Sequence, residues 1–449
     1  MRLNFLRRLP QSLIALPTRG LHRVSRIRLK SGSGLLSVVQ SRDILDGIGG
    51  GGRGADLFAR HLGLEEAIVG SPLSSGNRVL LLQDGPATYQ AMYAGILSAQ
   101  DHINIETYIL DDDAVGQSFA QALIDKQREG VQVNMIHDSF GTFTTPASFF
   151  QRLAESGIRV LEFNPVNPLS VRKVWELNRR DHRKLLIVDG RIAFLGGINI
   201  SSVYSGGSFN AGSRMGPDTT LAWRDTDLQL EGPVVAEFQK LFLAAWDKQS
   251  GQPLALRKYF PTLKSVGHDV VRAIGSSPED SYSLIYVTLL SAIRNARVSV
   301  HLINAYFVPD PRLLASLAAA AKRGVDVTLI LPSRTDAWLV FYAGRSYYGR
   351  LLRSGVKIYE RRGVILHSKV ALIDGVWATI GSTNLDWRSF LHNYEVNAVV
   401  LGVNFGNQLE AMFKKDLDGS EAITHDQWKR RPMVQRAKEM FARVWKYWL

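Results

Sequence analysis

The nine residues HRKLLIVDG at 182–190 return, in altered form, as HSKVALIDG at 367–375. Six residues separate the aspartate of each copy from a glycine, which is followed by glycine or serine, one further residue and asparagine. Two more pairs of matching segments precede these copies in the same order: GVQVNMI (130–136) with GVDVTLI (324–330), and SGIRV (156–160) with SGVKI (354–358). The repeat is far longer than the roughly 20–50 residues of solenoid repeats. The chain is therefore predicted to contain two homologous domains.

Short apolar segments with strand character alternate with helical segments in each half. In the first half we expect strands at 78–84, 102–110, 131–138 and 158–163, and helices through 119–126 and 149–155. This alternation indicates an α/β fold in which helices cover a central sheet. The Asp-Gly pairs at 189–190 and 374–375 are hairpin-turn signals, so each sheet is predicted to be mixed. A pseudo-twofold axis should relate the two domains and place the active site between them.

Composition limits both the domain organisation and the function. The chain has 449 residues, 45% of them hydrophobic and 21% charged, as is usual for globular proteins. We predict a basic arm with a glycine-rich linker at 1–55, a first repeat domain at 56–250 and a second at 251–449. The absence of cysteine excludes disulfides, thiolate metal sites and a cysteine nucleophile. The sequence contains no run of 18 or more apolar residues, so no transmembrane helix is predicted.

The net charge of +13 points to an anionic partner, which could be nucleic acid, a phosphorylated substrate or an acidic membrane surface. Eight basic residues lie within the first 30 positions, and the first acidic residue is Asp43. This segment could be an amphipathic arm on anionic lipid, a basic tail without a specific role, or a transit peptide. At the other end, 428–449 mixes Lys and Arg with Trp428, Phe441, Trp445, Tyr447 and Trp448. We favour membrane contact for this cluster over docking on the protein's own core.

The repeated motif has a spacing that suits phosphate chemistry. Side chains two residues apart on a strand share a face, so His182 points the same way as Lys184, and His367 the same way as Lys369. Two such half-sites facing each other would surround a phosphodiester with imidazoles and ammonium groups. One imidazole could attack phosphorus while the other protonates the leaving oxygen, with no metal or cofactor required. The residues alone do not show which histidine has which role.

Asparagines complete each predicted half-site. Asn199 and Asn384 follow Gly197 and Ser382, in glycine-containing turns that let backbone approach a ligand closely. We expect these four residues to bind the substrate phosphate, with the lysines and asparagines on its non-bridging oxygens.

The doubled motif resembles the phospholipase D superfamily over roughly 78–432. Within it, the finer resemblance is to bacterial cardiolipin synthases of the phospholipase D type, in their shorter, peripherally bound form, because the transmembrane helices that many of them carry near the N-terminus are not seen here. The segments that carry the resemblance are HDSFG (137–141), RRDHRKLLIVDG (179–190), GGIN (196–199), WRDTD (223–227), RSYYGRLLRSGVKIYE (345–360), LHSKVALIDG (366–375) and GSTNLDWRSFLHNYEVN (381–397).

The resemblance implies roles for the motif residues. His182 would form the phosphohistidine and His367 would be the general acid; the full set of catalytic motif residues would be His182, Lys184, Asp189, His367, Lys369 and Asp374. It implies transfer of a phosphatidyl group from one phospholipid, phosphatidylglycerol, to the headgroup hydroxyl of another, giving cardiolipin and glycerol. Phosphatidylethanolamine is a possible second substrate. The alternatives are a phospholipase D that uses water and, less favoured, a nuclease of the same superfamily.

The resemblance also implies a location and partners. We expect a peripheral protein on the anionic, cytoplasmic face of a bacterial inner membrane, with no nucleic-acid partner; the oligomeric state is left open.

A separate carboxylate is expected to orient each histidine. Asp189 and Asp374 have the wrong parity and lie at turns, so they should not bond their own motif histidines. Aligning RDTDLQL (224–230) with YEVNAVV (394–400) places Asp225 opposite Glu395. We assign Asp225 to His182 and Glu395 to His367. Between Asn199 and Asp225 lies a Gly- and Ser-rich loop that could flank an acyl channel or close over the site.

Overall fold

One continuous mixed sheet runs through both halves of the chain. The computed structural model describes residues 27–50, 53–68, 71–166, 178–207, 221–249 and 251–445. The strands of the first half follow one another across the sheet as β6 (Arg159–Phe163), β5 (Gln132–Asp138), β4 (His102–Thr107), β8 (Leu185–Val188), β9 (Ile192–Gly196), β11 (Thr226–Glu231) and β3 (Ser74–Gln83). β4, β5 and β6 are parallel, and the other pairings are antiparallel.

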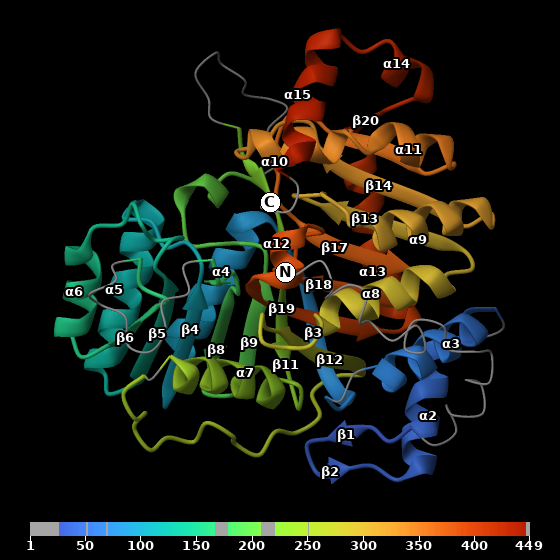
Figure 1. Cartoon of the computed structure of the whole chain (residues 1–449). Helices are drawn as coiled ribbons and strands as arrows, with labels where there is room; N and C mark the ends of the chain where they lie inside the picture. Colours follow the sequence, from blue (N-terminus) through green and yellow to red (C-terminus); the bar gives the residue numbers. More distant parts are fainter. Residues whose placement is uncertain are drawn as a thin grey trace.

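The second half repeats this order in reverse. Its strands run as β12 (Asp269–Ser276), β19 (Asn393–Leu401), β18 (Trp377–Gly381), β17 (Lys369–Ile373), β13 (Ser299–Asn304), β14 (Asp326–Pro332) and β15 (Lys357–Arg361). β3 and β12 pair antiparallel and join the two halves at the centre of the molecule (Figure 1). The reversed order is that of two units related by an approximate twofold axis, which confirms the predicted mixed α/β repeat.

Helices cover the sheet and connect its parallel strands. The first half contributes α4 (Asp84–Ser98), α5 (Ala114–Arg128), α6 (Ala147–Glu155) and α7 (Val235–Lys248). The second contributes α8 (Leu284–Asn295), α9 (Pro311–Lys322), α10 (Trp338–Arg345), α11 (Tyr348–Arg353), α12 (Trp387–Leu391) and α13 (Val403–Asp418). Local sequence sets their starts: α5 and α9 follow Asp113 and Asp310, whose carboxylates accept N–H groups of the first turn. Every residue of β8 is buried, as expected of a strand covered on both faces.

The two helices before β3 pack on the second half of the molecule. The short strands β1 (Lys30–Ser31) and β2 (Gly34–Leu35) precede them and pair with each other, and β1 also pairs with β3. The glycine-rich linker predicted within 1–55 covers the stretch 47–54, and most of that stretch lies in α2 (Val38–Gly49) and α3 (Arg53–Ile68), so that prediction was wrong. Leu45 of α2 and Phe58 of α3 join the same buried cluster as α8. The sequence-based boundary at 56 assigned α3 to the first domain, whereas in the structure α3 packs on α8. Residues 1–26 of the predicted arm lie outside the described residues, and the description begins at Ile27.

The C-terminal region adds β20 (Ser420–Ala422), α14 (His425–Lys429) and α15 (Met433–Val444) beside β15 and α10. Trp428 is buried against Tyr348, which corrects its assignment to a membrane-contacting cluster. Phe441 and Trp445 are exposed, and Tyr447 and Trp448 lie outside the described residues. In the part of the chain that is described, no helix is both long and apolar enough to cross a bilayer.

Candidate active site

The aspartates of the two motifs hold turns. Asp189 and Asp374 have positive φ angles of 51° and 54°, and each is followed by a glycine in the same region, as a tight hairpin requires. The Asp189 carboxylate accepts the backbone N–H groups of residues 100–102 at 2.8–3.0 Å. Asp374 accepts those of residues 297–299 at 2.7–3.0 Å, and His61 Nε2 lies 2.9 Å from it. Neither contacts its motif histidine, as the strand parity predicted.

His182 lies between β7 (Arg180–Asp181) and β8, in a buried position. Its Nδ1 is 3.1 Å from the Glu395 carboxylate, and its backbone N–H donates to the Tyr394 carbonyl at 3.0 Å. The Lys184 ammonium donates to the His182 carbonyl at 2.7 Å. The ring of Tyr108 meets the imidazole edge-on, with ring centroids 4.9 Å apart. His182 and Lys184 thus stand directly before β8 and lie close together.

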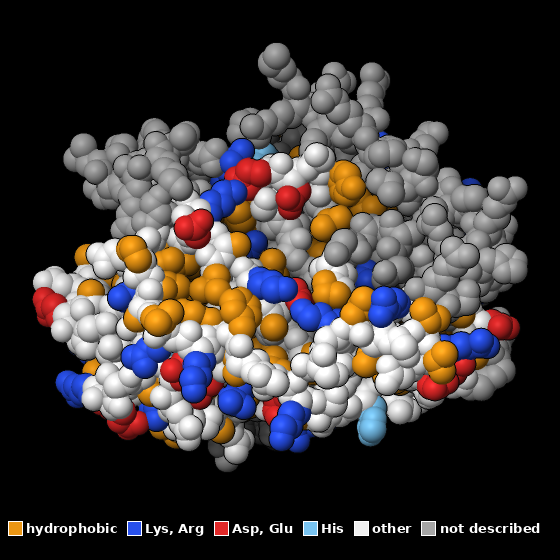
Figure 2. All heavy atoms as spheres, turned by 90° about the horizontal axis from the view of Figure 1, so that it is seen from below, with side chains coloured by type: hydrophobic (Ala, Val, Ile, Leu, Met, Phe, Trp, Pro, Cys, Tyr) orange, Lys and Arg blue, Asp and Glu red, His pale blue; other side chains and the backbone are white. Residues whose placement is uncertain are grey.

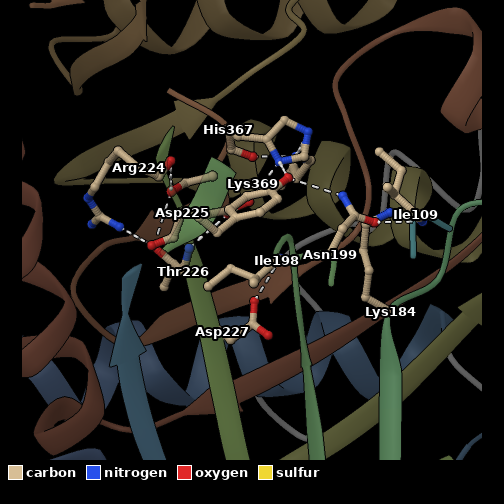
Figure 3. A network of polar contacts seen from close by, with 12 residues as sticks. Ile109, Lys184, Ile198, Asn199, Arg224, Asp225, Thr226, Asp227, His367 and Lys369 are labelled. Carbon is tan, nitrogen blue, oxygen red and sulfur yellow. Dashed lines mark hydrogen bonds and ion pairs between the residues drawn. The ribbon is translucent and has the colours of Figure 1, made fainter. Parts of the chain in front are cut away.

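His367 occupies the matching place before β17. Its Nδ1 is 2.7 Å from the Asp225 carboxylate, and its backbone N–H donates to the Arg224 carbonyl at 2.8 Å. The Lys369 ammonium lies 2.9 Å and 3.1 Å from the two ring nitrogens, and the Tyr204 hydroxyl lies 3.2 Å from Nδ1. Figure 3 shows this half-site with Asn199 lying between the His367–Lys369 pair and Lys184 of the other half.

The assignment of carboxylates to histidines was therefore wrong, although both carboxylates were identified. Asp225 serves His367 and Glu395 serves His182, so each half supplies the carboxylate for the other half's histidine. The cause is strand pairing. β10 (Trp223–Arg224) runs parallel to β16 (Ile365–Leu366), directly before His367, and the start of β19 runs parallel to β7, directly before His182. The site is complete only when both halves are joined.

Gly197 and Ser382 lie against these carboxylates. A Cβ on Gly197 would lie 2.3 Å from a carboxylate oxygen of Asp225, so glycine leaves room for the acid. The backbone N–H of Gly197 donates a hydrogen bond to the Thr226 carbonyl. In the other half, the Ser382 hydroxyl donates to Glu395 in a short hydrogen bond and accepts the Val396 N–H at 3.0 Å. The two positions thus contact the orienting acids, and their binding of substrate phosphate stays a prediction.

The two asparagines have different surroundings. The side-chain oxygen of Asn199 accepts the Ile109 N–H at 3.1 Å, and its nitrogen donates to the Tyr204 hydroxyl at 3.1 Å. Asn384 is also buried, but its side-chain oxygen has no hydrogen-bond partner among the described residues. Asn199 is thus part of the protein's own network, whereas Asn384 keeps hydrogen-bonding capacity.

Burial and charge decide the protonation of the site. Burial, with a contribution from Lys184, lowers the pKa of His182 to about 4, and burial with Lys369 lowers the pKa of His367. Burial lowers the pKa of Lys184 to about 7 and that of Lys369 in the same direction. Burial opposes ionisation of Asp225, but nearby Lys369 and His367 outweigh it and lower its pKa. The resting site thus combines neutral imidazoles with ionised orienting acids.

Two tyrosines were missed by the sequence reasoning. Tyr108 lies against His182, and Tyr306 lies against His367 with ring centroids 6.0 Å apart. Each follows the end of an equivalent strand, β4 or β13. A comparison of ETYIL (106–110) with NAYFV (304–308) would have found the pair, because Tyr stands at the same position in both. Tyr204 offered no such signal, since Ser389 stands at the corresponding distance after Asn384.

The comparison with known families decides the family. Residues 92–213 and 289–417 match the family described as "Cardiolipin synthase, PLD-like domain". The chain belongs to this cardiolipin synthase family of phospholipase D-like proteins. It is 34% identical over 375 residues to the cardiolipin synthase of Geobacillus kaustophilus, covering 83% of this chain and 72% of that protein. It is 33% identical over 372 residues to the major cardiolipin synthase ClsA of Bacillus subtilis, covering 82% and 74%.

A solved structure supports the fold in addition. Phosphatidylserine synthase of Haemophilus influenzae superposes with a TM-score of 0.62 at 13% identity, covering 87% of this chain and all of that one. At this identity the likeness shows the fold alone. Family membership confirms the expected class of enzyme, a phosphatidyltransferase of the phospholipase D superfamily, and the function of a cardiolipin synthase.

Proposed function

We propose that the chain transfers a phosphatidyl group from one phosphatidylglycerol to the glycerol headgroup of a second, giving cardiolipin and free glycerol. The observation that carries the mechanism is the crossed pair of buried His–carboxylate contacts, 3.1 Å for His182–Glu395 and 2.7 Å for His367–Asp225. In each pair the carboxylate holds Nδ1–H, so that Nε2 is left to act on the substrate.

The first step forms the covalent intermediate. Nε2 of neutral His182 attacks phosphorus while the bond from phosphorus to the glycerol oxygen breaks. His367, protonated as the anionic substrate enters, gives its Nε2 proton to that oxygen, and glycerol leaves. The ammonium groups of Lys184 and Lys369 stabilise the charge on the non-bridging oxygens. Asp225 stabilises the cationic form of His367 before the proton leaves.

The second step releases the product. The hydroxyl of a second phosphatidylglycerol gives its proton to His367, its oxygen attacks phosphorus, and the bond from phosphorus to His182 breaks. Water in place of that hydroxyl would give phosphatidic acid, so exclusion of water determines whether the enzyme transfers or hydrolyses. We further propose that the protein binds peripherally to the anionic, cytoplasmic face of a bacterial inner membrane. Phosphatidylethanolamine is a possible second lipid substrate.

Product analysis tests this function. Labelled phosphatidylglycerol, incubated with the protein alone and with added phosphatidylethanolamine, should yield cardiolipin and glycerol by mass spectrometry. Phosphatidic acid as the main product would instead identify a hydrolase, and cleavage of a phosphodiester oligonucleotide without lipid turnover would identify a nuclease.

The two histidine variants test the order of the steps. His182→Ala should abolish all transfer because no phosphoenzyme can form. His367→Ala should still form a phosphoenzyme from an ester with an activated leaving group, which needs no proton. A labelled phosphoenzyme that maps to His367 would reverse the two roles.

A further inference from the structure

Helix α15 carries its apolar side chains outward. Six apolar residues on it and directly after it repeat at helical spacing and are 45–74% exposed: Met433, Val434, Met440, Phe441, Val444 and Trp445. The helix packs against α10, and its buried residues are Glu439 and Ala442. A surface helix of a globular protein normally has the opposite arrangement, with its apolar stripe toward the core. An outward apolar stripe on a strongly amphipathic helix is typical of helices that lie in a membrane interface.

A basic groove adjoins this helix. It has a volume of about 460 Å³ and lies between α11, α14 and α15. Among the described residues that line it there is no Asp or Glu, and its cations are Arg350, Arg353, Lys429, Arg431, Arg436 and Arg443. Arg431 is held by Glu439 at 2.7 Å, whereas Arg350 and Arg353 are exposed. The guanidinium fork matches phosphate oxygens, so the groove suits the phosphate of an anionic headgroup.

The apolar face of α15 continues toward the second half-site. Trp338, the first residue of α10, stacks on Phe441 with ring planes 8° apart and centroids 6.5 Å apart. Two residues earlier, Asp336 accepts the Tyr306 hydroxyl at 2.7 Å, and the ring of Tyr306 lies against His367. A short, contiguous set of contacts therefore joins the exposed apolar face to the reacting histidine.

The first half-site has exposed aromatic side chains in the equivalent position. The loop after β5 carries Phe140 and Phe143, which are 61% and 73% exposed. Gly141 of this loop lies so close to the Tyr108 carbonyl that a Cβ would be 2.0 Å from it, and Tyr108 contacts His182. In each half, exposed aromatic residues are therefore connected to the histidine through a few neighbouring residues.

Another face of the molecule offers a comparison. Seen from below, apolar side chains also gather among Lys and Arg (Figure 2). The connection from α7 to β12 crosses this lower face (Figure 1), and its Leu256 and Phe260 are exposed. This connection has no helix or strand and no helical apolar stripe. It therefore provides a matched control of exposed apolar residues outside α15.

We propose that the outward face of α15 and the basic groove beside it form a docking site for an anionic phospholipid bilayer. The helix lies in the plane of the interface, the groove takes lipid phosphates, and both half-sites are brought to headgroup level. The proposal deepens the proposed function, since it rests on a lipid substrate that stays in the membrane while it reacts.

Vesicle flotation of the full chain tests the docking site. Binding is measured to vesicles of phosphatidylcholine with and without phosphatidylglycerol. The unchanged protein is compared with two variants. The α15 variant combines Met440→Ser, Phe441→Ser and Val444→Ser, and the groove variant combines Arg350→Gln and Arg353→Gln. We expect strong preference for the anionic vesicles and at least a tenfold loss of binding in both variants. Each arginine should account for about fivefold, which corresponds to ~1 kcal/mol per basic residue near an anionic surface. Leu256→Ser with Phe260→Ser should bind as the unchanged protein does.

A soluble substrate separates this proposal from the proposed function. On monomeric short-chain phosphatidylglycerol, all these variants should keep the turnover of the unchanged protein, because none of the altered residues touches the half-sites. Unchanged vesicle binding in both α15 and groove variants would overturn the docking site. The docking site would also be overturned if the unchanged protein proved to be a dimer and the α15 variant a monomer that still binds vesicles. That result would identify the α15 face as a protein interface. Failure of the unchanged protein to turn over the soluble substrate would count against the proposed function and leave the binding result standing.

Discussion

The two half-sites have the same parts but different surroundings. Within the described residues, one aromatic ring, that of Tyr108, contacts the His182 imidazole, whereas His367 has three such neighbours, Tyr204, Trp223 and Tyr306. The difference fits the two proposed roles. An imidazole that attacks phosphorus must reach the substrate, which suits His182 with its single ring neighbour. An imidazole that passes a proton back and forth benefits from enclosure, because water is kept from the leaving oxygen.

The residues that contact the two orienting acids also differ, and the difference follows the length of the acid. The longer acid, Glu395, is held by the hydroxyl of Ser382, and the shorter acid, Asp225, fits against Gly197. Each acid therefore depends on the residue at the second position of its own half's glycine-containing turn, Gly197 or Ser382. Because the acids cross to the opposite histidines, a change in one half should impair the chemistry of the other. The following predictions test that relationship.

The largest effect is expected from the orienting acids themselves. Asp225→Asn and Glu395→Gln should each lower turnover at least tenfold, and up to about 10⁴-fold by analogy with the orienting aspartate of serine proteases. With an activated leaving group, Asp225→Asn should still form the phosphoenzyme, because its partner His367 is then not needed as an acid. Glu395→Gln should not form it, because its partner His182 is the nucleophile. Rapid-quench measurement of the phosphoenzyme checks this, and the reverse pattern would show uncrossed pairs.

The supporting positions should follow in size. Gly197→Ala places a Cβ against the Asp225 carboxylate and should lower turnover by more than tenfold through His367. Ser382→Ala removes one hydrogen bond from Glu395, worth about 1–3 kcal/mol to a charged group, and should cost about tenfold through His182. The phosphoenzyme assay with an activated ester separates them, since only Ser382→Ala should slow that step. Equal slowing in both variants would contradict the crossed arrangement.

The pH profile should follow the charges of the first half-site. Neutral His182 is needed for attack, so kcat/KM should rise as pH increases through about 4. Charged Lys184 is needed for the phosphate, so kcat/KM should fall as pH increases through about 7. Lys184→Arg should move the falling limb far to higher pH, because arginine stays charged. Lys322→Arg, on the exposed end of α9, is the control and should leave both limbs in place.

The motif aspartates should affect folding more than chemistry. Asp374→Asn and Asp189→Asn weaken the capping of three backbone N–H groups each, and Asp374→Asn also loses the contact with His61. We expect a loss of about 1–3 kcal/mol in the free energy of unfolding, larger for Asp374. Thermal melting measures it, with exposed Asp418→Asn as the control. A loss of turnover in a variant that melts normally would assign these residues a direct role.

The smallest effect is expected two residues along the strand from Asp225. Burial and the charge of Asp225 raise the pKa of Asp227 to about 8, so at pH 7 it is a neutral acid. The second half has Asn397 at the matching position. Asp227→Asn should therefore keep turnover within about twofold, since it retains the acceptor for the Ile198 N–H. Steady-state turnover beside Asp225→Asn gives a matched pair, and a tenfold loss would show that Asp227 works as an anion.

The repeat, the strands and the motif residues could all be predicted from the order of the amino acids alone. The spacing in HRKLLIVDG and HSKVALIDG paired each His with its Lys and placed each Asp at a turn, because side chains so near in sequence are positioned by the local backbone. The alignment of the halves also found Asp225 and Glu395. It could have found Tyr108 and Tyr306, since these occupy matching positions in the same repeat.

Which of these groups contact one another depends on how the two halves pack together. Two homologous halves have the same local pattern, so that pattern cannot state whether an acid serves its own histidine or the other one. The answer lies in the pairing of β10 with β16 and of β19 with β7, which are contacts between strands more than 140 and 210 residues apart. The outward face of α15 is likewise a tertiary result, because its apolar spacing fits a buried helix equally well. The spacing fixes which residues share a face, and packing alone fixes what that face meets.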